Sequence, residues 1–514
     1  MADASIQEAA RHYQARDLVQ AERCCRAMIA ADPRHFDALH LLGVVCVMQD
    51  RHADALEFLS RARTEQPNNA QLLFNLGNAH QGLKQHDQAV AAYQHAQTIS
   101  PGNLGVLNNL GTSLRLLGRA GEAAHCYRDI LARQPDHAPA HNNLATALAD
   151  LGDLEAAAES YRRSLAFAPS DTPPDRLASV VNGLGKVLMD LGRHDEALAA
   201  CRTLQDRHPG LKVVEWNESL ALLLRGDYAA GWRKYEARWS VPEHDKPHPD
   251  QVVLDLAAVG GKRVLVTVEQ GRGDVIQFSR YVPMLVACGA RVTFHVYDDL
   301  KALLGTMPVV GEAEDPPYDL RTSLLSLPLA FGTTLATVPA AVPYLSAPPD
   351  RVALWRARLG PRDRKRIGIA WSGSPASRTR SAIPVGLLDP LLRLGGFEFH
   401  LLQKEIADPH PRVVRHDHRL GDFADTAALI QAMDLVISID TAVAHLAGAL
   451  GKPVWIMLPF NPDWRWLLGR DDSPWYPTAR LFRQTTRGGW AEVVQHVVAA
   501  MIQRPEPENS VQTP

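Results

Sequence analysis

Five prolines recur at a fixed interval in the first third of the chain. They are 34 residues apart, at Pro33, Pro67, Pro101, Pro135 and Pro169. An alanine precedes each of them by twelve residues, at Ala21, Ala55, Ala89, Ala123 and Ala157. A unit of this length holds two short antiparallel helices, which cannot bury their apolar faces alone and must stack on a neighbouring pair. The period therefore predicts an α-solenoid.

Two further positions repeat in the same register. A Leu-Gly pair marks the first helix of successive units, at Leu42-Gly43, Leu76-Gly77 and Leu110-Gly111. A tyrosine marks the second helix, at Tyr93, Tyr127 and Tyr161. Together these positions resemble the tetratricopeptide repeat. An insertion near residues 171–176 delays the sixth unit, so we expect about seven repeats in residues 1–240, followed by a linker at 241–250.

Asparagines form a ladder on the expected first helices, at Asn75, Asn109, Asn143 and, in the last unit, Asn217. Asparagine is a poor helix former, so its recurrence there needs a reason. One interpretation is hydrogen bonding between helices or simple duplication of the repeat. The other is that the amides line a concave surface and bind the backbone of an extended peptide. The nucleocytoplasmic protein O-GlcNAc transferases have a similar ladder, and this resemblance implies peptide binding.

After the linker, short apolar segments alternate with helical ones. The expected strands are residues 262–268, 291–296, 366–371, 397–402, 434–440 and 453–458. Buried strands separated by helices are typical of doubly wound parallel sheets, which bind ligands at the carboxyl ends of their strands. We expect two Rossmann-like lobes, 251–349 and 350–505, with one cleft between them and a disordered tail at 506–514.

Two segments of this region carry a second resemblance. Residues 435–453, LVISIDTAVAHLAGALGKP, resemble the strand, Asp-Thr and His element of ADP-heptose:lipopolysaccharide heptosyltransferases, and Gly273-Asp274-Val275 resembles their N-terminal loop. Residues 271–490 as a whole are similar to bacterial proteins in which tetratricopeptide repeats are fused to such a domain, flagellin glycosyltransferases among them. The resemblance implies a glycosyltransferase-B fold, a nucleotide sugar held by the lobe 350–505, an acceptor presented from the lobe 251–349, and inversion of stereochemistry.

Asp274 follows the first expected strand and faces the expected cleft. A carboxylate there can take the proton of an acceptor hydroxyl, and the resembling heptosyltransferases place their base at this Gly-Asp. The alternative is a structural role, because aspartate is favoured in the first turn of a helix.

Asp440 and Thr441 end a buried strand and open a helix whose free N–H groups and dipole suit a diphosphate. His445, one turn later, lies on the same side of that helix as Thr441 and can hydrogen-bond the leaving phosphate. The alternative for His445 is packing between the lobes. Asp440 is expected to organise the turn. The sequence has no D-x-D motif, so we expect no metal ion and no cofactor besides the nucleotide sugar as co-substrate.

Two more loops are expected to contact the donor. The first follows the strand 366–371 and contains hydroxyls, a glycine and two arginines that suit a diphosphate, with candidates Ser372, Gly373, Arg378 and Arg380. The second follows the strand 397–402. There the resemblance implies contacts of Lys404 and Glu405 with the nucleotide.

The composition of the chain limits which classes of molecule it is expected to bind. Lys and Arg number 54 and Asp and Glu 57, so the net charge of −3 gives no general attraction to nucleic acid or anionic membranes. No run of 18 apolar residues and no signal-peptide pattern is present, which favours a cytoplasmic protein without a membrane span. The six cysteines form no C-x-x-C pair and indicate neither disulfides nor a zinc site. Oligomeric state is not indicated.

All ten tryptophans lie at or beyond Trp216, so the repeats and the remainder are built differently. Three of them, with a tyrosine, form a late cluster at Trp464, Trp466, Trp475 and Tyr476. Packing of the C-terminal lobe is one interpretation of this cluster and stacking on a sugar is the other.

These patterns together predict a protein O-glycosyltransferase. The repeat arm would recruit a polypeptide, which the resemblance implies to be similar to flagellin, and the two-lobed domain would transfer a sugar to its Ser or Thr. Two alternatives remain open. One is an interaction scaffold with a degenerate transferase domain, and the other is a heptosyltransferase-like enzyme acting on a glycan or lipid acceptor. The sequence does not identify the sugar or the nucleotide.

Overall fold

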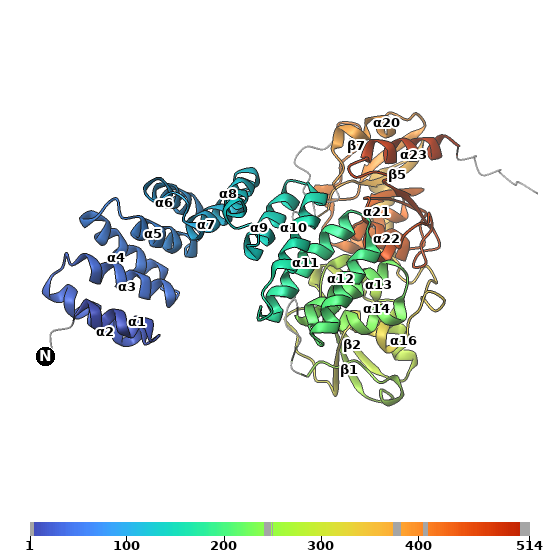
Figure 1. Cartoon of the computed structure of the whole chain (residues 1–514). Helices are drawn as coiled ribbons and strands as arrows, with labels where there is room; N and C mark the ends of the chain where they lie inside the picture. The colour runs from blue at the N-terminus through green and yellow to red at the C-terminus, as the bar shows by residue number, and fades with distance from the viewer. Residues whose placement is uncertain (1–4, 241–247, 249, 374–381, 405–409, 504–514) are drawn as a thin grey trace, which may run out of the picture. The chain divides into compact units, whose positions relative to one another are not determined.

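A computed structural model describes residues 5–240, 248, 250–373, 382–404 and 410–503. The chain forms two compact units, Met1–Leu191 and Gly192–Pro514. The first contains helices only, and the second contains helices and two sheets (Figure 1). The predicted tail 506–514 and most of the predicted linker 241–250 lie outside the described residues.

The first unit is a stack of helix pairs. The first helices of the pairs are α1 (Ile6–Gln14), α3 (Phe36–Met48), α5 (Ala70–Gly82), α7 (Leu104–Leu116), α9 (Ala138–Asp150) and α11 (Pro174–Asp190). The second helices are α2 (Leu18–Ala31), α4 (His52–Glu65), α6 (His86–Ile99), α8 (Ala120–Arg133) and α10 (Leu154–Phe167). Each periodic proline stands two residues after a second helix, where it cannot extend that helix. The predicted solenoid is confirmed.

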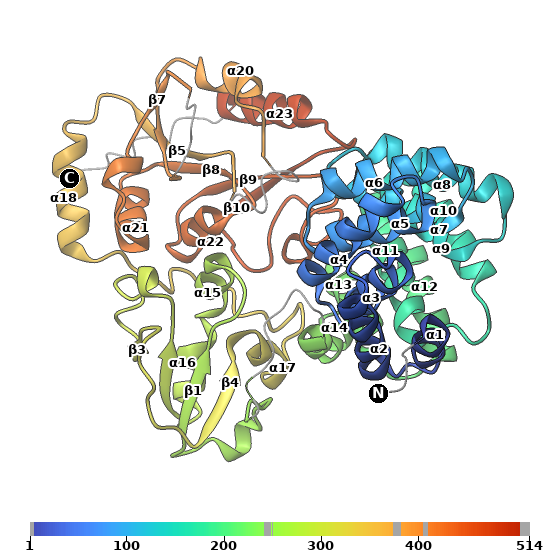
Figure 2. The same ribbon diagram turned by 90° about the vertical axis from the view of Figure 1, so that its left-hand side faces the viewer.

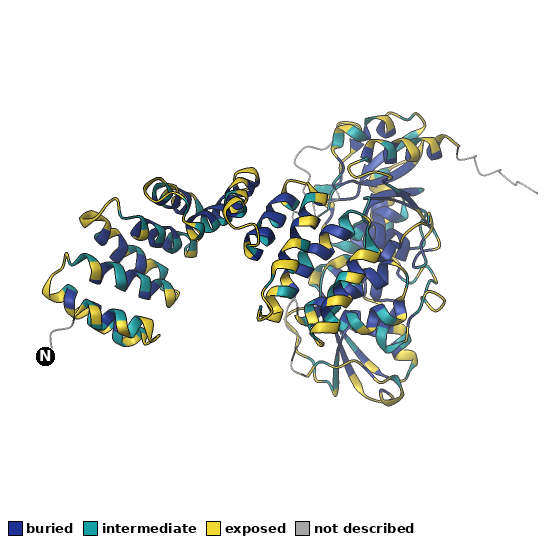
Figure 3. Ribbon diagram, in the orientation of Figure 1, coloured by how far each residue is buried: buried dark blue, intermediate teal, exposed yellow. Residues whose placement is uncertain are grey.

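Glycine and tyrosine set the distance between the two helices of a pair. A methyl group on Gly111 would lie 2.8 Å from the Tyr127 ring, and one on Gly77 would overlap the Tyr93 ring. Both tyrosines are buried. Figure 3 shows that, along the stack, buried residues lie on the helix faces that pack together and exposed residues lie on the outer faces. The repeated glycine and the repeated tyrosine therefore mark one contact, between the first and the second helix of a pair, which recurs along the stack.

Three further helices belong to the second unit: α12 (His194–Arg207), α13 (Lys212–Leu224) and α14 (Tyr228–Tyr235), followed by the 3-10 turn η1 (Glu236–Ser240). The helix pairs thus continue as far as the expected end of the repeats, but the boundary between the compact units comes earlier, after Leu191. Aromatic side chains of α14 share a core with the C-terminal lobe, so the last pair packs with the sheets.

The first sheet has the strand order β3-β2-β1-β4, and the pairs among these strands are parallel. Its strands are β1 (Arg263–Thr267), β2 (Arg291–His295), β3 (Val309–Val310) and β4 (Leu320–Ser323). Its helices are α15 (Arg272–Phe278), α16 (Tyr281–Ala287) and α17 (Leu327–Ala330). Val264 of the central strand pairs with Val292 on one side and Leu320 on the other. The two strands predicted here, 262–268 and 291–296, are confirmed.

The second sheet has the order β10-β9-β8-β5-β6-β7, again with parallel pairs. Its strands are β5 (Lys365–Ala370), β6 (Phe397–Leu401), β7 (Val413–Val414), β8 (Leu435–Ile439), β9 (Val454–Leu458) and β10 (Ala479–Arg483). Its helices are α18 (Pro349–Leu359), α20 (Asp389–Leu392), α21 (Phe423–Gln431), α22 (Ala442–Ala449) and α23 (Trp490–Gln503). The four predicted strands are confirmed, and β7 and β10 at the two edges are additional.

The core of the second sheet lies under α23. Ile437 and Met457 from adjacent strands belong to one buried cluster with Val493 and Val497 of that helix. Figure 2 shows both sheets, and α15 of the first lies against α22 of the second. The predicted class, an α-solenoid followed by two parallel sheets as in a glycosyltransferase-B fold, is confirmed. No helix among the described residues combines the length and apolarity needed to cross a bilayer.

The late tryptophan cluster is packed in the interior of the second unit. Trp475 is fully buried and donates a hydrogen bond from Nε1 to the Tyr228 hydroxyl of α14 at 3.0 Å. The Trp464 ring meets the Trp232 ring edge to face, with centroids 5.1 Å apart. Trp464 and Trp475 therefore pack in the protein interior, as the first of the two interpretations predicts.

Candidate active site

The Gly-Asp loop joins β1 to α15, at the carboxyl end of the first sheet. Gly271 is the N-cap residue of α15, and its N–H donates to Asp274 Oδ2 at 2.9 Å. Asp274 thus has the structural role that was the alternative to catalysis. Its second oxygen, Oδ1, pairs with Arg465. The side chain of Asp274 remains 17% exposed, so one carboxylate both caps the helix and keeps access to solvent.

The Asp-Thr element joins β8 to α22. Thr441 is the N-cap residue of α22, but its hydroxyl contacts Ser438 Oγ at 3.1 Å and does not cap the helix. The first N–H groups of α22 are therefore not satisfied by this side chain, as a helix N-terminus that receives an anion requires.

His445 lies one turn into α22 and is almost completely buried. Its Nδ1 is 3.0 Å from the Tyr476 hydroxyl, and its Nε2 is 3.6 Å from Asp440 Oδ1. Its ring stacks on Trp466 with centroids 5.3 Å apart. Burial alone would raise the pKa of Asp440, but the interaction with His445 holds that pKa below its usual value. Asp440 therefore stays ionised and fixes the imidazole, as expected of a residue that organises the turn.

The two loops meet at Gly273. A methyl group on Gly273 would lie 3.1 Å from His445 Cδ2 and 3.5 Å from the Cα atom of Ala442. Because no larger side chain fits without displacing His445, glycine lets the N-terminus of α15 approach the N-terminus of α22. The sequence predictions for Asp274, Asp440, Thr441 and His445 thus fall on adjoining parts of one region.

Arg465 is a component of this region that sequence reasoning missed. It lies on the 3-10 turn η7 (Trp464–Trp466) and is 7% exposed. Besides its pair with Asp274, it binds Asp463 at 2.7 Å and donates from Nε to Gln277 Oε1 at 2.9 Å. Burial alone would lower the pKa of Arg465, but Asp463 and Asp274 raise it, so the guanidinium stays charged.

The predicted donor loops follow two adjacent strands of the second sheet. Gln403 Oε1 accepts hydrogen bonds from the backbone N–H of Trp371 at 2.6 Å and of Ser372 at 3.2 Å, which joins the ends of β5 and β6. Lys404 donates to the carbonyl of Gly421 at 2.8 Å. Ser372, Gly373 and Lys404 thus lie at the carboxyl edge of the sheet that also carries Asp440. Arg378, Arg380 and Glu405 lie outside the described residues.

The asparagine ladder connects neighbouring first helices. Asn75 Nδ2 lies 2.8 Å from His40 Nε2. Burial lowers the pKa of His40, which favours the neutral ring as an acceptor. Asn109 donates to Asn78 at 2.9 Å, and Asn143 donates to Asn108 at 2.8 Å. The interpretation as interhelical hydrogen bonds therefore holds for these three, and peptide binding stays a prediction.

Asn217 differs from the other members of the ladder. It lies in α13 of the second unit, and its buried amide nitrogen has no hydrogen-bond partner among the described residues.

A groove of about 600 Å³ opens on the first helices of the repeats. Apolar and polar side chains of α1, α3 and α5 line it, and Asn75 is among them. The other lining residues are Ile6, Ala10, Tyr13, Asp37, His40, Leu41, Val44, Val47, Met48, Gln71, Phe74 and Asn78. The groove thus combines apolar side chains with the amides of Gln71, Asn75 and Asn78.

Family models match two parts of the chain. Tetratricopeptide repeat models match residues 6–70, 70–103 and 108–172, and the model described as glycosyltransferase family 9 (heptosyltransferase) matches residues 421–457. Protein FlbA of Caulobacter vibrioides (strain ATCC 19089 / CIP 103742 / CB 15) is 29% identical over 360 residues, a match covering 61% of this chain. The chain spans 59% of the length of FlbA.

Several solved structures are similar to part of the chain. A crystal structure of MamA is 20% identical and covers 31% of this chain and 93% of its own, with a TM-score of 0.30. The structure from a functional characterisation of Pseudomonas aeruginosa pilF is 20% identical, covering 41% and 93% with a TM-score of 0.35. A tetratricopeptide repeat protein from Parabacteroides merdae ATCC 43184 is 16% identical, covering 46% and 91% with a TM-score of 0.38.

The family 9 match contains three of the site residues, Asp440, Thr441 and His445. It implies a sugar donor, and the repeats imply interactions with other proteins. The chain therefore carries N-terminal tetratricopeptide repeats together with a glycosyltransferase family 9 (heptosyltransferase) segment.

Proposed function

We propose that this protein transfers a sugar from a nucleotide-sugar donor to Ser or Thr of a polypeptide recruited by its repeats. The reaction would need no metal ion and would invert the anomeric centre. The approach of Gly273 to His445 carries the proposal, because it brings a candidate base and a candidate phosphate site together. The family 9 match over residues 421–457 supports a sugar donor.

In the proposed reaction, the acceptor hydroxyl oxygen attacks the anomeric carbon while Asp274 takes the hydroxyl proton. The bond from that carbon to the diphosphate breaks, and the nucleoside diphosphate leaves with the electron pair. Each oxygen of Asp274 accepts one hydrogen bond: Oδ2 from the N–H of Gly271 and Oδ1 from Arg465. Since a carboxylate oxygen has two lone-pair sites, Asp274 keeps capacity for the acceptor proton.

Charge on the leaving diphosphate would be stabilised at the N-terminus of α22. The uncapped N–H groups there carry partial positive charge. The ring of His445, whose two nitrogens face Tyr476 and Asp440, packs between this terminus and Gly273. Ser372, Gly373 and Lys404, on the neighbouring loops at the same sheet edge, are the other described candidates for donor contacts. Fixed dipoles in a region that excludes water stabilise developing charge more than water does.

A polypeptide acceptor is favoured by the groove on α1, α3 and α5. Its lining includes both amides and large apolar side chains such as Val44, Met48 and Phe74. A scaffold with a degenerate transferase domain would not need Asp274 and His445 brought together. An enzyme for glycan or lipid acceptors would leave the groove without a function.

Nucleotide binding is the first test. At a concentration of 100 times its dissociation constant, the cognate nucleoside diphosphate is expected to stabilise the full chain by about 2.7 kcal/mol. Thermal shift against a panel of nucleoside diphosphates measures this. Thr441→Val is expected to reduce the shift, and Thr485→Val, an exposed threonine of the same lobe, is expected to keep it. Absence of a shift with every nucleotide would favour the scaffold.

The ladder gives a second test, with KM for the acceptor as its readout. Replacing Asn75, Asn109 and Asn143 by Ala is expected to raise KM for a protein acceptor while donor hydrolysis is unchanged. The same change removes interhelical hydrogen bonds worth about 1 kcal/mol each, so stability falls as well. Asn108→Ala breaks the bond to Asn143 but keeps the ladder. If KM rises equally in the triple variant and in Asn108→Ala, the ladder has only a structural role. The same conclusion follows if KM rises in neither variant.

A further inference from the structure

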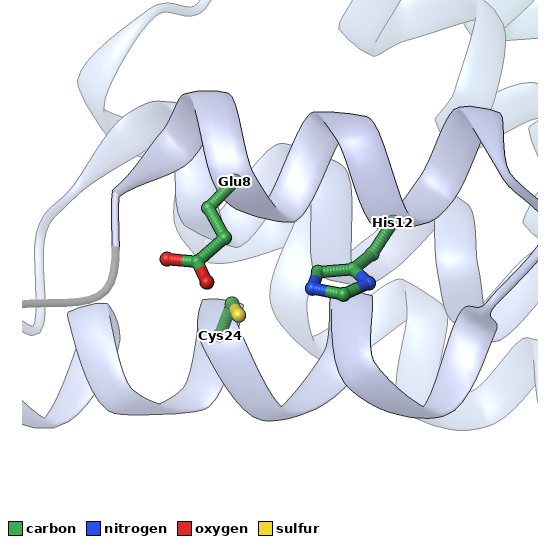
Figure 4. A group of neighbouring side chains, drawn as sticks. All are labelled: Glu8, His12 and Cys24. Atoms are coloured by element: carbon green, nitrogen blue, oxygen red, sulfur yellow. The ribbon is translucent and has the colours of Figure 1, made fainter. Parts of the chain in front are cut away.

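Three metal-ligating side chains gather between the first two helices. Glu8 and His12 lie one turn apart on α1, and Cys24 lies on α2. One potential ligand atom from each lies within 4.8 Å of the others, and all three residues are partly buried. Figure 4 shows them pointing toward one another, with one ring nitrogen of His12 facing Cys24.

The other nitrogen of His12 already has a partner. His12 Nδ1 lies 3.6 Å from Asp17 Oδ2, and the second oxygen of Asp17 accepts the backbone N–H of Gln20 at 3.1 Å as the N-cap of α2. A carboxylate on that side of the imidazole favours the tautomer with the proton on Nδ1 and the lone pair on Nε2. Metal-binding histidines are oriented in this way in most protein sites.

We propose that Glu8, His12 and Cys24 bind a divalent transition-metal ion of the zinc class, with water as the fourth ligand. Thiolate, imidazole and carboxylate are the ligands that zinc takes in proteins, whereas magnesium and calcium prefer oxygen alone. Bond lengths of about 2.0 to 2.3 Å in a tetrahedral site put ligand atoms about 3.3 to 3.7 Å apart. The three atoms, which lie within 4.8 Å of one another, would have to move closer by about 1 Å to reach that spacing when an ion binds.

Binding replaces a proton by the metal at the thiol. The metal–sulfur bond forms as the Cys24 proton passes to solvent, while Glu8 and neutral His12 each provide a lone pair. Burial and the carboxylate of Glu8 raise the pKa of the Cys24 thiol, so the metal-free thiol is protonated at neutral pH and metal binding releases that proton.

The ion would fix a helix that is otherwise weakly held. Ala9 is the buried residue of α1. The same helix contributes Ile6, Ala10 and Tyr13 to the groove on the repeats. A metal joining α1 to α2 would therefore hold one wall of that groove in place. This site is independent of the proposed sugar transfer, and its test uses no transferase activity.

The experiment titrates the metal-free full chain with Co²⁺ and follows the absorption spectrum. We expect one Co²⁺ per chain, a thiolate-to-cobalt charge-transfer band and tetrahedral ligand-field bands, all lost when Zn²⁺ is added. Cys24→Ser is expected to abolish the charge-transfer band. Cys288→Ser, which changes another partly buried cysteine in the second unit, is expected to keep it. Asp17→Asn preserves the helix cap but is expected to weaken Zn²⁺ binding about tenfold.

Three outcomes would overturn the proposal. They are a titration without saturation, a charge-transfer band that persists in Cys24→Ser, and Zn²⁺ affinity that is unchanged in His12→Gln. Circular dichroism of each variant verifies that the helices are intact, so a lost band reports a lost ligand. Because the readout is spectroscopic, an inactive transferase domain would leave the result interpretable.

Discussion

Asp274→Asn is expected to lower the rate of sugar transfer by about 10² to 10⁴-fold, the usual contribution of a general base. The amide has the shape of the carboxylate, and its oxygen can still accept the N–H of Gly271 that caps α15. It cannot take a proton from the acceptor. Transfer at saturating donor and acceptor measures the loss, and thermal shift with the nucleoside diphosphate should show that binding persists.

Asp319→Asn is the matched control for this substitution. Asp319 pairs with Arg263 at 2.8 Å, at the amino end of the same sheet and therefore at the opposite edge from the candidate site. We expect Asp319→Asn to transfer sugar at the rate of the unchanged chain. Turnover retained in Asp274→Asn would show that capping α15 and pairing with Arg465 are the whole role of Asp274.

Arg465→Met is expected to destabilise the second unit by about 3 kcal/mol, the lower end of the range for breaking a buried ion pair. Methionine fills much of the volume but leaves Asp274 and Asp463 without their cation. The lower end applies because the side chain of Asp463 is 36% exposed, whereas that of Asp274 is 17% exposed. Water can therefore compensate one of the two carboxylates.

Chemical denaturation followed by tryptophan fluorescence measures this loss. All ten tryptophans lie at or beyond Trp216, so the signal comes from the second unit alone. Arg470→Met is the control, because Arg470 pairs with Asp472, whose side chain is 65% exposed. Exposed pairs contribute about 0 to 1 kcal/mol. Equal losses in the two variants would mean that Arg465 does not act as a buried countercharge.

The repeat period and the apolar segments were enough to predict the architecture. A 34-residue interval leaves little choice but stacked helix pairs, and the predicted strands overlap β1, β2, β5, β6, β8 and β9. The edge strands escaped prediction for a physical reason. Strand β7 has only two residues, too few for any periodicity, and β10 is five residues long and carries two arginines, Arg480 and Arg483, so no apolar run marks it.

Residues of the candidate site could be predicted only where their place directly after a strand determines where they lie in the fold. Asp274 follows a strand of the first sheet and Asp440 a strand of the second, so the sequence could place each of them at the carboxyl edge of its own sheet. Arg465 could not be found in that way, because its partner Asp274 lies 191 residues earlier. Its neighbours Trp464 and Trp466 indicated packing, and a charged residue between two buried rings was the signal available.

The contacts of the asparagine ladder and of the cluster on α1 and α2 could not be predicted from the sequence, for a related reason. The spacing of Asn109 and Asn143 was visible, but their partners Asn78 and Asn108 lie 31 and 35 residues away and share no single offset. Cys24 likewise has no second cysteine nearby in a zinc-binding spacing, because the remaining ligands come from the facing helix. Contacts between helices depend on the packing of a pair, which a residue-type pattern does not encode.

The shared core of α14 and the C-terminal lobe limits how this protein can be recombined. The buried rings of Trp232 and Trp464 meet, and Tyr228 accepts the hydrogen bond of Trp475. A chimera joined at residue 240 would separate these aromatic partners and leave a large apolar surface in water. A junction after Leu191 keeps them together. Under the proposed function, the repeats upstream of that junction would then be the part to exchange between relatives in order to change the acceptor, while α12 to α14 stay with the two sheets.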